Sequence, residues 1–273
     1  MKRALLIALT ACLISTTAAC GGKSEMTPEE LAKLTEDKLA EAEAMIASDQ
    51  EGLAKANFDW VLEQDPNNGR AHAGMAQMYL GKNDPQSATP HAEKAAAASP
   101  DDPKVQATLG EVLGKVGRAE EAAAAYAKAW ELSPDDTRYG HGQGKALNAA
   151  KKYAEAEAVL RKVGDEDPRA QYVWTDLGDA LREQDKLDEA LRTYMKAQNE
   201  YGSDKGAYAG AAMVYEAKEE WDKAVTQLGG YIQRDCCSTY SDEWAKPKLL
   251  ELEAKAKGGA APTEDAPEDA PEE

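Results

Sequence analysis

Four prolines stand at one fixed spacing, and this spacing constrains what the chain can fold into. Pro66, Pro100, Pro134 and Pro168 follow one another at intervals of 34 residues. A fixed period of this length is the signature of a repeat architecture, in which similar units stack on their neighbours. With proline at position 32 of each unit, the units are 35–68, 69–102, 103–136, 137–170, 171–204 and 205–238.

Three further positions recur in this frame. Position 20 is always alanine: Ala54, Ala88, Ala122, Ala156, Ala190 and Ala224. Position 8 is always small: Ala42, Ala76, Gly110, Gly144, Gly178 and Ala212. Position 11 is always large: Met45, Tyr79, Leu113, Leu147, Leu181 and Tyr215. Small residues let two helices approach closely, and proline ends a helix because it cannot continue one. The pattern therefore predicts stacked helical hairpins.

The pattern resembles that of the tetratricopeptide repeat family, which has Trp at position 4, Leu at 7, Ala at 20, an aromatic residue at 24 and Pro at 32. Unit 103–136 follows it closely, whereas 35–68 keeps only its second half. Gly202 and Cys236 stand where the prolines of the last two units would fall. The resemblance covers about 35–238 and implies a superhelical array of about six hairpins. The best match is unit 171–204, with Trp174, Leu177, Gly178, Leu181, Ala190, Tyr194 and Ala197.

Composition agrees with an all-α fold. Hydrophobic residues make up 42% of the chain but aromatic residues only 6%, so alanine carries much of the apolar count, as in closely packed helices. The net charge is −18, and loss of Lys2 and Arg3 with an N-terminal signal would make it −20. A protein needs clustered positive charge to bind nucleic acids or anionic lipid surfaces, so this negative net charge disfavours both as partners.

Residues 1–19 read as an export signal. Lys2 and Arg3 precede an apolar stretch that is too short to span a bilayer, which needs about 20 residues. Small residues before Cys20 resemble the lipobox of bacterial lipoproteins, and the resemblance implies that lipid is attached to Cys20. Cys12 is a second candidate for the lipidated cysteine, and a cleaved signal that yields a soluble periplasmic protein is a third interpretation. The predicted location is the outer membrane facing the periplasm, with the cell surface and the soluble periplasm as alternatives.

The expected domains follow in order. Residues 20–27 lack apolar periodicity and are predicted to be a flexible tether. Thr27, Pro28 and Glu30 form a helix-start pattern, with an N-cap, a proline in the first turn and an acidic residue three positions after the cap. A repeat domain is expected over 28–257, ending in a helix from about Asp242 whose start Pro247 should delay or kink. The acidic segment 258–273 is predicted to be a disordered tail.

No enzyme site is indicated. The three histidines, His72, His91 and His141, fall in different parts of the frame, and no pair has metal-ligand spacing on one helix. Phosphate-binding loops and nucleophile motifs are missing from the sequence as well. We therefore expect no catalytic residue, no cofactor, no metal and no small-molecule substrate.

Cys236 and Cys237 are adjacent, in the loop before the final helix. Neighbouring Cα atoms lie about 3.8 Å apart, below the usual disulfide range, so a vicinal bridge would be strained. An inert reduced pair, a vicinal disulfide and a bond to another chain all remain open.

The family resemblance implies a partner-binding groove lined by the first helix of each hairpin. Position 2 then brings Arg70, Lys104, Arg138 and Tyr172 into the groove, and position 9 brings Lys145. The residues that form the carboxylate clamp of chaperone-binding members are not in place. We interpret the three cations at position 2 either as solvated surface charges or as a ladder for an acidic segment, which could be the chain's own residues 264–273 or part of a partner.

These features favour a membrane-anchored lipoprotein scaffold that binds a protein partner in the cell envelope. The chain looks like the pilotins that assist assembly of pilus secretins. An adaptor for cell-wall enzymes and a component of the outer-membrane barrel-insertion machinery are the alternatives.

Overall fold

The structure is a computed structural model that describes residues 26–48, 50–170, 172–235 and 238–258. Within these ranges it is all helical and contains no strand. The hairpins are α1 (Pro28–Ala47) with α2 (Glu51–Gln64), α3 (Gly69–Gly81) with α4 (Pro85–Ala98), α5 (Pro103–Lys115) with α6 (Ala119–Leu132), α7 (Thr137–Ala149) with α8 (Tyr153–Glu166), α9 (Val173–Arg182) with α10 (Leu187–Glu200), and α11 (Lys205–Ala217) with α12 (Trp221–Arg234). A π-helical turn, η1 (Ser241–Ala245), then leads into α13 (Lys246–Ala256).

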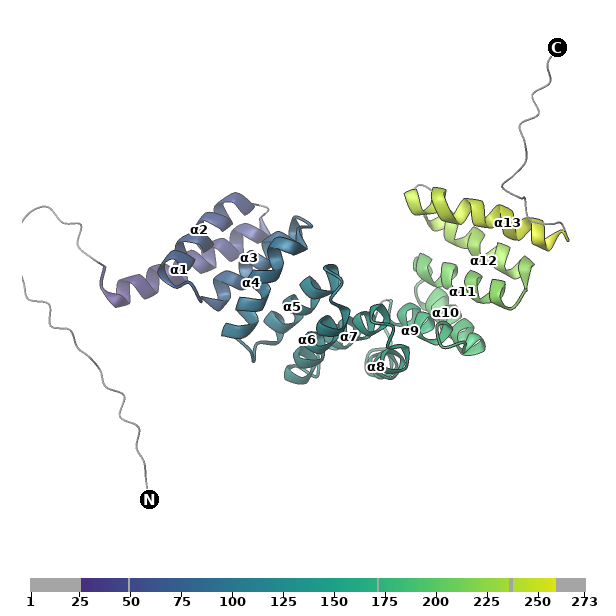
Figure 1. Ribbon diagram of the computed structural model, residues 1–273, viewed down its shortest axis with the longest axis horizontal. Coiled ribbons are helices and arrows are strands. Elements are labelled where there is room, and N and C mark those ends of the chain that lie inside the picture. Colours follow the sequence, from purple (N-terminus) through teal and green to yellow (C-terminus); the bar gives the residue numbers. More distant parts are fainter. Residues whose placement is uncertain (1–25, 49, 171, 236–237, 259–273) are drawn as a thin grey trace, which may run out of the picture.

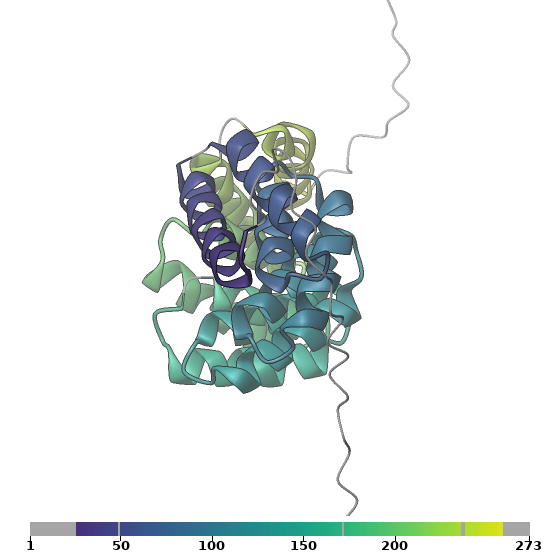
Figure 2. The ribbon, with the colours of Figure 1, turned by 90° about the vertical axis from the view of Figure 1, so that its left-hand side faces the viewer.

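The hairpins agree with the 34-residue frame. First helices begin at Gly69, Pro103, Thr137 and Lys205, which are the first residues of their predicted units. Each helix packs on the one that follows it, and first helices of neighbouring units also touch, as α5 does with α7 and α7 with α9. Figure 1 shows the hairpins following one another along a curved path, with α6 and α8 on its outer side. Figure 2 views the array from the end of α1 and shows the middle hairpins below the first and last ones, as in a superhelical turn.

Positions 8 and 20 hold the helices of each hairpin together. All six alanines at position 20 are fully buried. A Cβ atom built on Gly110 would lie 2.8 Å from the Tyr126 ring, and one on Gly178 would lie 2.6 Å from Tyr194, so the glycines at position 8 make room for the side chain at position 24. This confirms the predicted close approach and identifies the side chain that requires it.

Every second unit adds an aromatic ring to this packing. Phe58, Tyr126 and Tyr194 occupy position 24 at intervals of 68 residues, and each ring also packs on a glycine at position 6 of the next unit. Those glycines are Gly74, Gly142 and Gly210, where an added Cβ would lie 2.1, 2.6 and 2.3 Å from the ring. The structural period is therefore two units.

The links between units end one helix and start the next. Asn68, Asp102, Asp136 and Asp204 each accept a hydrogen bond from a backbone N–H of the helix that follows, as expected for N-caps. The carbonyl of the link proline is also used, because the side chain at position 4 donates to it. Gln106 Nε2 donates to Pro100 at 3.0 Å and Trp174 Nε1 to Pro168 at 3.4 Å.

The start of α1 is as predicted. Thr27 is its N-cap, Pro28 is its first residue, and Glu30 completes a capping box at 2.8 Å from the Thr27 N–H. At the other end, the α-helix that was expected from about Asp242 begins at Lys246, after the π-helical turn. The Lys246 N–H donates to Ser241 five residues earlier, and Pro247, which has no N–H, follows at once.

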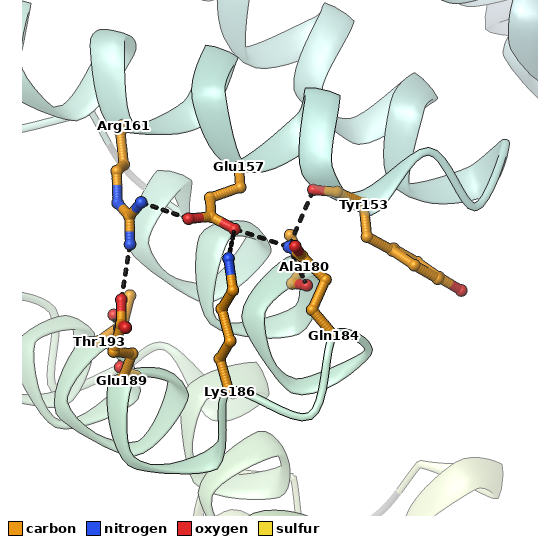
Figure 3. Close-up of polar contacts among 8 residues, drawn as sticks. All are labelled: Tyr153, Glu157, Arg161, Ala180, Gln184, Lys186, Glu189 and Thr193. Atoms are coloured by element: carbon orange, nitrogen blue, oxygen red, sulfur yellow. Dashed lines mark hydrogen bonds and ion pairs between the residues drawn. The ribbon is translucent and has the colours of Figure 1, made fainter.

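A buried carboxylate connects the fourth and fifth units. Glu157 on α8 is only 7% exposed, and it accepts hydrogen bonds from Gln184 at 2.7 Å and Lys186 at 2.8 Å (Figure 3). Arg161 contacts the same carboxylate and reaches Glu189 on α10 at 2.7 Å. Burial alone would raise the pKa of Glu157, but these donors outweigh it and lower the pKa. The contacts fix the rotation of one hairpin on the next.

Candidate protein-binding groove

Three hollows join into one groove along the first helices. The first, of about 390 Å³, lies between α3, α5 and α7, and it shares Glu111, Tyr126 and Arg138 with the second, of about 540 Å³. The second shares Lys145 with the third, of about 500 Å³, which extends over α9 and α11. We call this continuous surface the groove. The predicted side chains Lys104, Arg138, Lys145 and Tyr172 all line it.

Cations gather in the part of the groove that α5 and α7 form. Lys104, Lys115, Arg138 and Lys145 line this part and are exposed, and the acidic side chain beside them is Glu111. Arg138 pairs at 2.6 Å with Asp136, the N-cap of its own helix, and remains 85% exposed. Within the described part of the chain the three lysines make no ion pair. A strongly acidic protein thus leaves cations unpaired in its groove.

The acidic residues near α9 and α11 already have partners within the protein. Asp176 contacts His141 Nε2 at 2.5 Å, and Asp204 accepts from Thr175 Oγ1 at 2.5 Å. Asp179 accepts from the Tyr194 hydroxyl at 2.6 Å and lies 3.8 Å from Arg182. Burial raises the pKa of Asp179 and also that of Tyr194. These carboxylates are held by the protein, so they compete little for an incoming cation.

Tyr126 forms the floor between the first two hollows. Its ring lies between Gly110 and Gly142, and burial, followed by the charge of Glu111, raises the pKa of its hydroxyl to about 12. The hydroxyl therefore stays protonated at neutral pH and is a hydrogen-bond donor.

Tyr172 is exposed at the groove because its unit lacks the usual cap. Where other units have Asn or Asp before the first helix, this unit has Ala170, and α9 begins only at Val173. Tyr172 takes a left-handed backbone conformation with φ of 68° and its side chain is 48% exposed. With Tyr231 and Tyr240 it lines the third hollow.

Arg70 lies apart from these residues. Its guanidinium contacts Glu36 at 2.6 Å and Glu43 at 2.9 Å, both on α1. These glutamates raise its pKa, with the Glu36 hydrogen bond as the largest cause. The structure therefore brings Lys104 and Arg138 together in the groove and assigns Arg70 to the packing of α1 on α3.

His72 and His91 form a pair that sequence spacing does not reveal. They lie on the two helices of one hairpin, and their Nδ1 atoms are 2.9 Å apart. Burial lowers the pKa of both rings. Within the described ranges, no group of three or more His, Cys, Asp or Glu side chains could hold a metal ion.

Several predicted features lie outside the described residues: the signal 1–19, the lipid site Cys20, most of the tether, the pair Cys236 and Cys237, and the acidic tail after Gly258. None of the described helices is both long and apolar enough to cross a membrane.

Comparison with known proteins supports the fold. Two family models, both described as tetratricopeptide repeat, match residues 39–103 and residues 79–146 with 147–212. No curated protein matches the chain.

Solved structures with a similar fold include PilF of Pseudomonas aeruginosa, at 20% identity and a TM-score of 0.61 over 79% of this chain and 98% of that one. PilW, described as a type IV pilus biogenesis factor, has 18% identity and a TM-score of 0.65 over 77% and 98%. YrrB, described as having an unusual peptide-binding site, has 18% identity and a TM-score of 0.53 over 69% and 97%. At these identities the likeness shows the fold.

Proposed function

Because the chain belongs to the tetratricopeptide repeat family, whose members bind proteins, we propose that it is a lipid-anchored scaffold that holds an envelope protein in its groove. The observation that carries this proposal is the set of unpaired cations on α5 and α7 in a chain of net charge −18. Other exposed cations, such as Lys94 and Arg192, also make no ion pair within the described residues, but the cations on α5 and α7 gather in one hollow whose acidic lining residue is Glu111. Their clustering fits a surface that receives negative charge from a partner.

The anchor is proposed from the N-terminal sequence. Lys2 and Arg3, the short apolar stretch and the small residues before Cys20 are the features of a lipoprotein signal. Several acyl chains on Cys20 would hold the protein at the outer membrane, facing the periplasm. The scaffold works by binding alone and carries no catalytic step.

A pilus secretin is the partner that we favour. The similarity in fold to PilF and PilW supports this choice, and so do the uniform repeats that begin close to Cys20. An adaptor for cell-wall enzymes and a role in barrel assembly are the alternatives. Secretin and pilus genes beside the gene for this chain would support the first role, and murein hydrolase genes the adaptor.

Capture from membranes tests the groove. The full chain and a variant with Arg138→Glu and Lys145→Glu would be used to retain partners from detergent-solubilised membranes of the parent cell. A matched control carries Lys94→Glu and Arg192→Glu, which make the same charge change at exposed cations outside the groove lining. We expect the groove variant alone to lose the partner. Equal retention by both variants would contradict the proposal.

The anchor has its own test. Cys20→Ala should move the protein from the membrane fraction to the soluble periplasm, because the acyl chains would no longer be attached. Cys12→Ala is the matched control and should leave the protein in the membrane. A Cys20→Ala protein that stays with the membrane after a carbonate wash would show that Cys20 is not the lipid site.

A further inference from the structure

Two parts of the groove are copies of one another, displaced by two repeat units. Shifting the residue numbers of the first two hollows by 68 gives ten of the fourteen residues that line the third. The corresponding pairs include Lys104 with Tyr172, Glu111 with Asp179, Gly114 with Arg182, Arg138 with Gly206, and Lys145 with Met213.

The two copies have the same backbone frame. In the first, the Tyr126 ring lies between Gly110 and Gly142, and in the second the Tyr194 ring lies between Gly178 and Gly210. Both tyrosines are close to an acidic side chain at position 9 of their unit, Glu111 or Asp179. The path along the groove is therefore equivalent at the two places, and only the side chains on it differ.

The two copies differ in side-chain chemistry at the matching positions, although Lys145 and Lys205 also line the third hollow. We call the first the cation subsite, formed by Lys104, Arg138 and Lys145. In the second, tyrosine, glycine and methionine stand at the matching positions, and Tyr240 is added at the rim with 51% of its side chain exposed. Here the side chain of Arg182 approaches Asp179, where the first copy has Gly114 in place of the arginine. We call this second copy the tyrosine subsite, formed by Tyr172, Met213 and Tyr240.

We propose that the groove binds one extended partner segment that places carboxylates in the cation subsite and an aromatic or large apolar side chain in the tyrosine subsite. This inference rests on the proposed function, because it assumes that the groove holds a protein segment. Unpaired lysines select the carboxylates by charge, and exposed tyrosine rings with a methionine favour an apolar side chain.

The geometry also sets the spacing in the partner. The subsites are two first-helix steps apart, since α5 packs on α7, α7 on α9 and α9 on α11. Packed helices lie about 8–10 Å apart, so equivalent positions of the two copies, such as Lys104 and Tyr172, are separated by about 16–20 Å. An extended chain rises about 3.3 Å per residue, which places the apolar side chain about five or six residues from the carboxylates.

The chain's own acidic segment meets only half of this requirement. Residues 264–273 include six carboxylates but no aromatic or large apolar residue. Tethering raises its effective concentration, so it can compete for the cation subsite. It has nothing to place in the tyrosine subsite, and we expect a partner with both features to displace it.

Synthetic peptides test the inference directly. The probes are labelled 12-residue peptides with three glutamates at one end, a Gly/Ser spacer and one phenylalanine about six residues away, made in both orders. Control peptides replace the phenylalanine by serine or the glutamates by glutamine. Fluorescence anisotropy with the full chain in detergent at low salt should show one order binding about tenfold more tightly than either control peptide.

Variants of the protein locate each contact. The triple variant Lys104→Glu, Arg138→Glu and Lys145→Glu should bind the peptide that has both the glutamates and the phenylalanine about tenfold or more weakly than the parent does. Added salt should reduce this difference in affinity. Lys33→Glu with Lys94→Glu and Arg192→Glu makes the same change at exposed cations elsewhere and should have little effect. Tyr172→Ser should lower the affinity for the phenylalanine peptide but leave the affinity for the serine peptide unchanged. Deleting residues 259–273 should tighten all glutamate peptides.

Four outcomes decide the matter. Equal affinity of the phenylalanine and serine peptides in both orders would overturn the tyrosine subsite, and equal losses in the two triple variants would overturn the cation subsite. Circular dichroism melts of the variants, all altered at exposed side chains, check that the fold is kept. If the groove variant loses its membrane partner but no peptide shows this selectivity, the scaffold function stands and the two-subsite inference fails. If peptides behave as expected but the partner is retained, the proposed function fails instead.

Discussion

The tautomers of the buried His72 and the partly buried His91 follow from a single backbone contact. His72 Nε2 lies 3.0 Å from the Pro66 carbonyl, which can only accept, so Nε2 carries the proton. The neutral ring then presents Nδ1 as an acceptor, and His91 Nδ1 must donate to it across 2.9 Å. Gln106 makes the corresponding bond to Pro100 in the next unit without titrating. A second proton therefore disturbs the histidine pair and leaves the glutamine site unchanged.

This arrangement predicts a dependence of stability on pH. The folded pKa values of His72 and His91 are lowered by burial from the ordinary value of 6.5, so the folded protein binds fewer protons than the unfolded chain. The stability that the pair contributes is complete above about pH 6.5 and is lost as pH falls toward the lowered pKa values. We expect the free energy of unfolding to decline over this window.

His72→Gln is the variant that checks the prediction, because it copies Gln106 and keeps the bond to the proline carbonyl. Chemical unfolding between pH 7 and pH 5 should show a smaller decline for this variant than for the parent. Gln106→Ala is the control, because it removes the corresponding bond from a side chain that does not titrate and should therefore leave the decline unchanged. Identical pH profiles for His72→Gln and the parent would contradict the assigned tautomers.

At the scale of helices, the turn inside each hairpin has one recurring conformation. Position 15 has positive φ in every unit from the second to the sixth, at Asn83, Gly117, Lys151, Asp185 and Glu219. The following N–H donates back five residues to the carbonyl of position 11, as Arg118 does to Leu113 at 2.9 Å and Lys152 to Leu147 at 2.9 Å. This is the Schellman ending of a helix, which favours glycine at the left-handed residue.

Lys151→Gly should therefore raise the free energy of unfolding, by about 0.5–1 kcal/mol, because glycine adopts the left-handed conformation without a Cβ clash. The reverse change is available in the third unit, where Gly117→Ala should lower it by about 1 kcal/mol. Denaturant unfolding of both variants measures the difference. The conformation assigned to position 15 would be refuted if both changes shifted stability in the same direction.

The buried alanines at position 20 give a second prediction at this scale. Ala190 is fully buried in the core that α5 to α11 share, so Ala190→Leu should overpack it and cost about 1–3 kcal/mol. Ala124→Leu, at an exposed alanine on α6, is the control and should change stability by less than about 0.5 kcal/mol. Hydrogen exchange should show the loss spreading from α10 into the adjoining hairpins, since repeats are coupled through their neighbours. Unchanged unfolding of Ala190→Leu would mean that position 20 is not the close contact.

At the scale of the whole molecule, the repeat frame could be predicted because the same contacts recur in every unit. Positions 8, 20 and 32 each perform one packing or helix-ending role, so residue identity alone sets the register. The start of α1 was predictable for a similar reason, since Thr27, Pro28 and Glu30 interact within one turn.

The groove was only partly predictable, because it depends on contacts between units. Repeat position places Lys104, Arg138, Lys145 and Tyr172 in the groove. Whether Arg70 also lies there depends on where Glu36 and Glu43 fall on α1, because they pair with it. That helix begins at Pro28, before the first unit, so the repeat frame says nothing of its pairing. The exposure of Tyr172 likewise depends on the missing cap at Ala170, and the histidine pair depends on two helices that meet side by side.

The central claim is that a partner lies in the groove formed by the first helices, and site-specific photo-crosslinking in intact cells tests it most directly. A photoreactive amino acid would be placed at Thr108 or Lys145 in the groove, and at Lys94 or Arg192 outside it. We predict that the groove positions crosslink to one partner and that the outer positions crosslink to none. In the protein with the photoreactive residue at Thr108, the additional change Arg138→Glu should abolish the crosslink. Crosslinks to the same partner from Lys94 and Arg192, with none from the groove, would contradict the account.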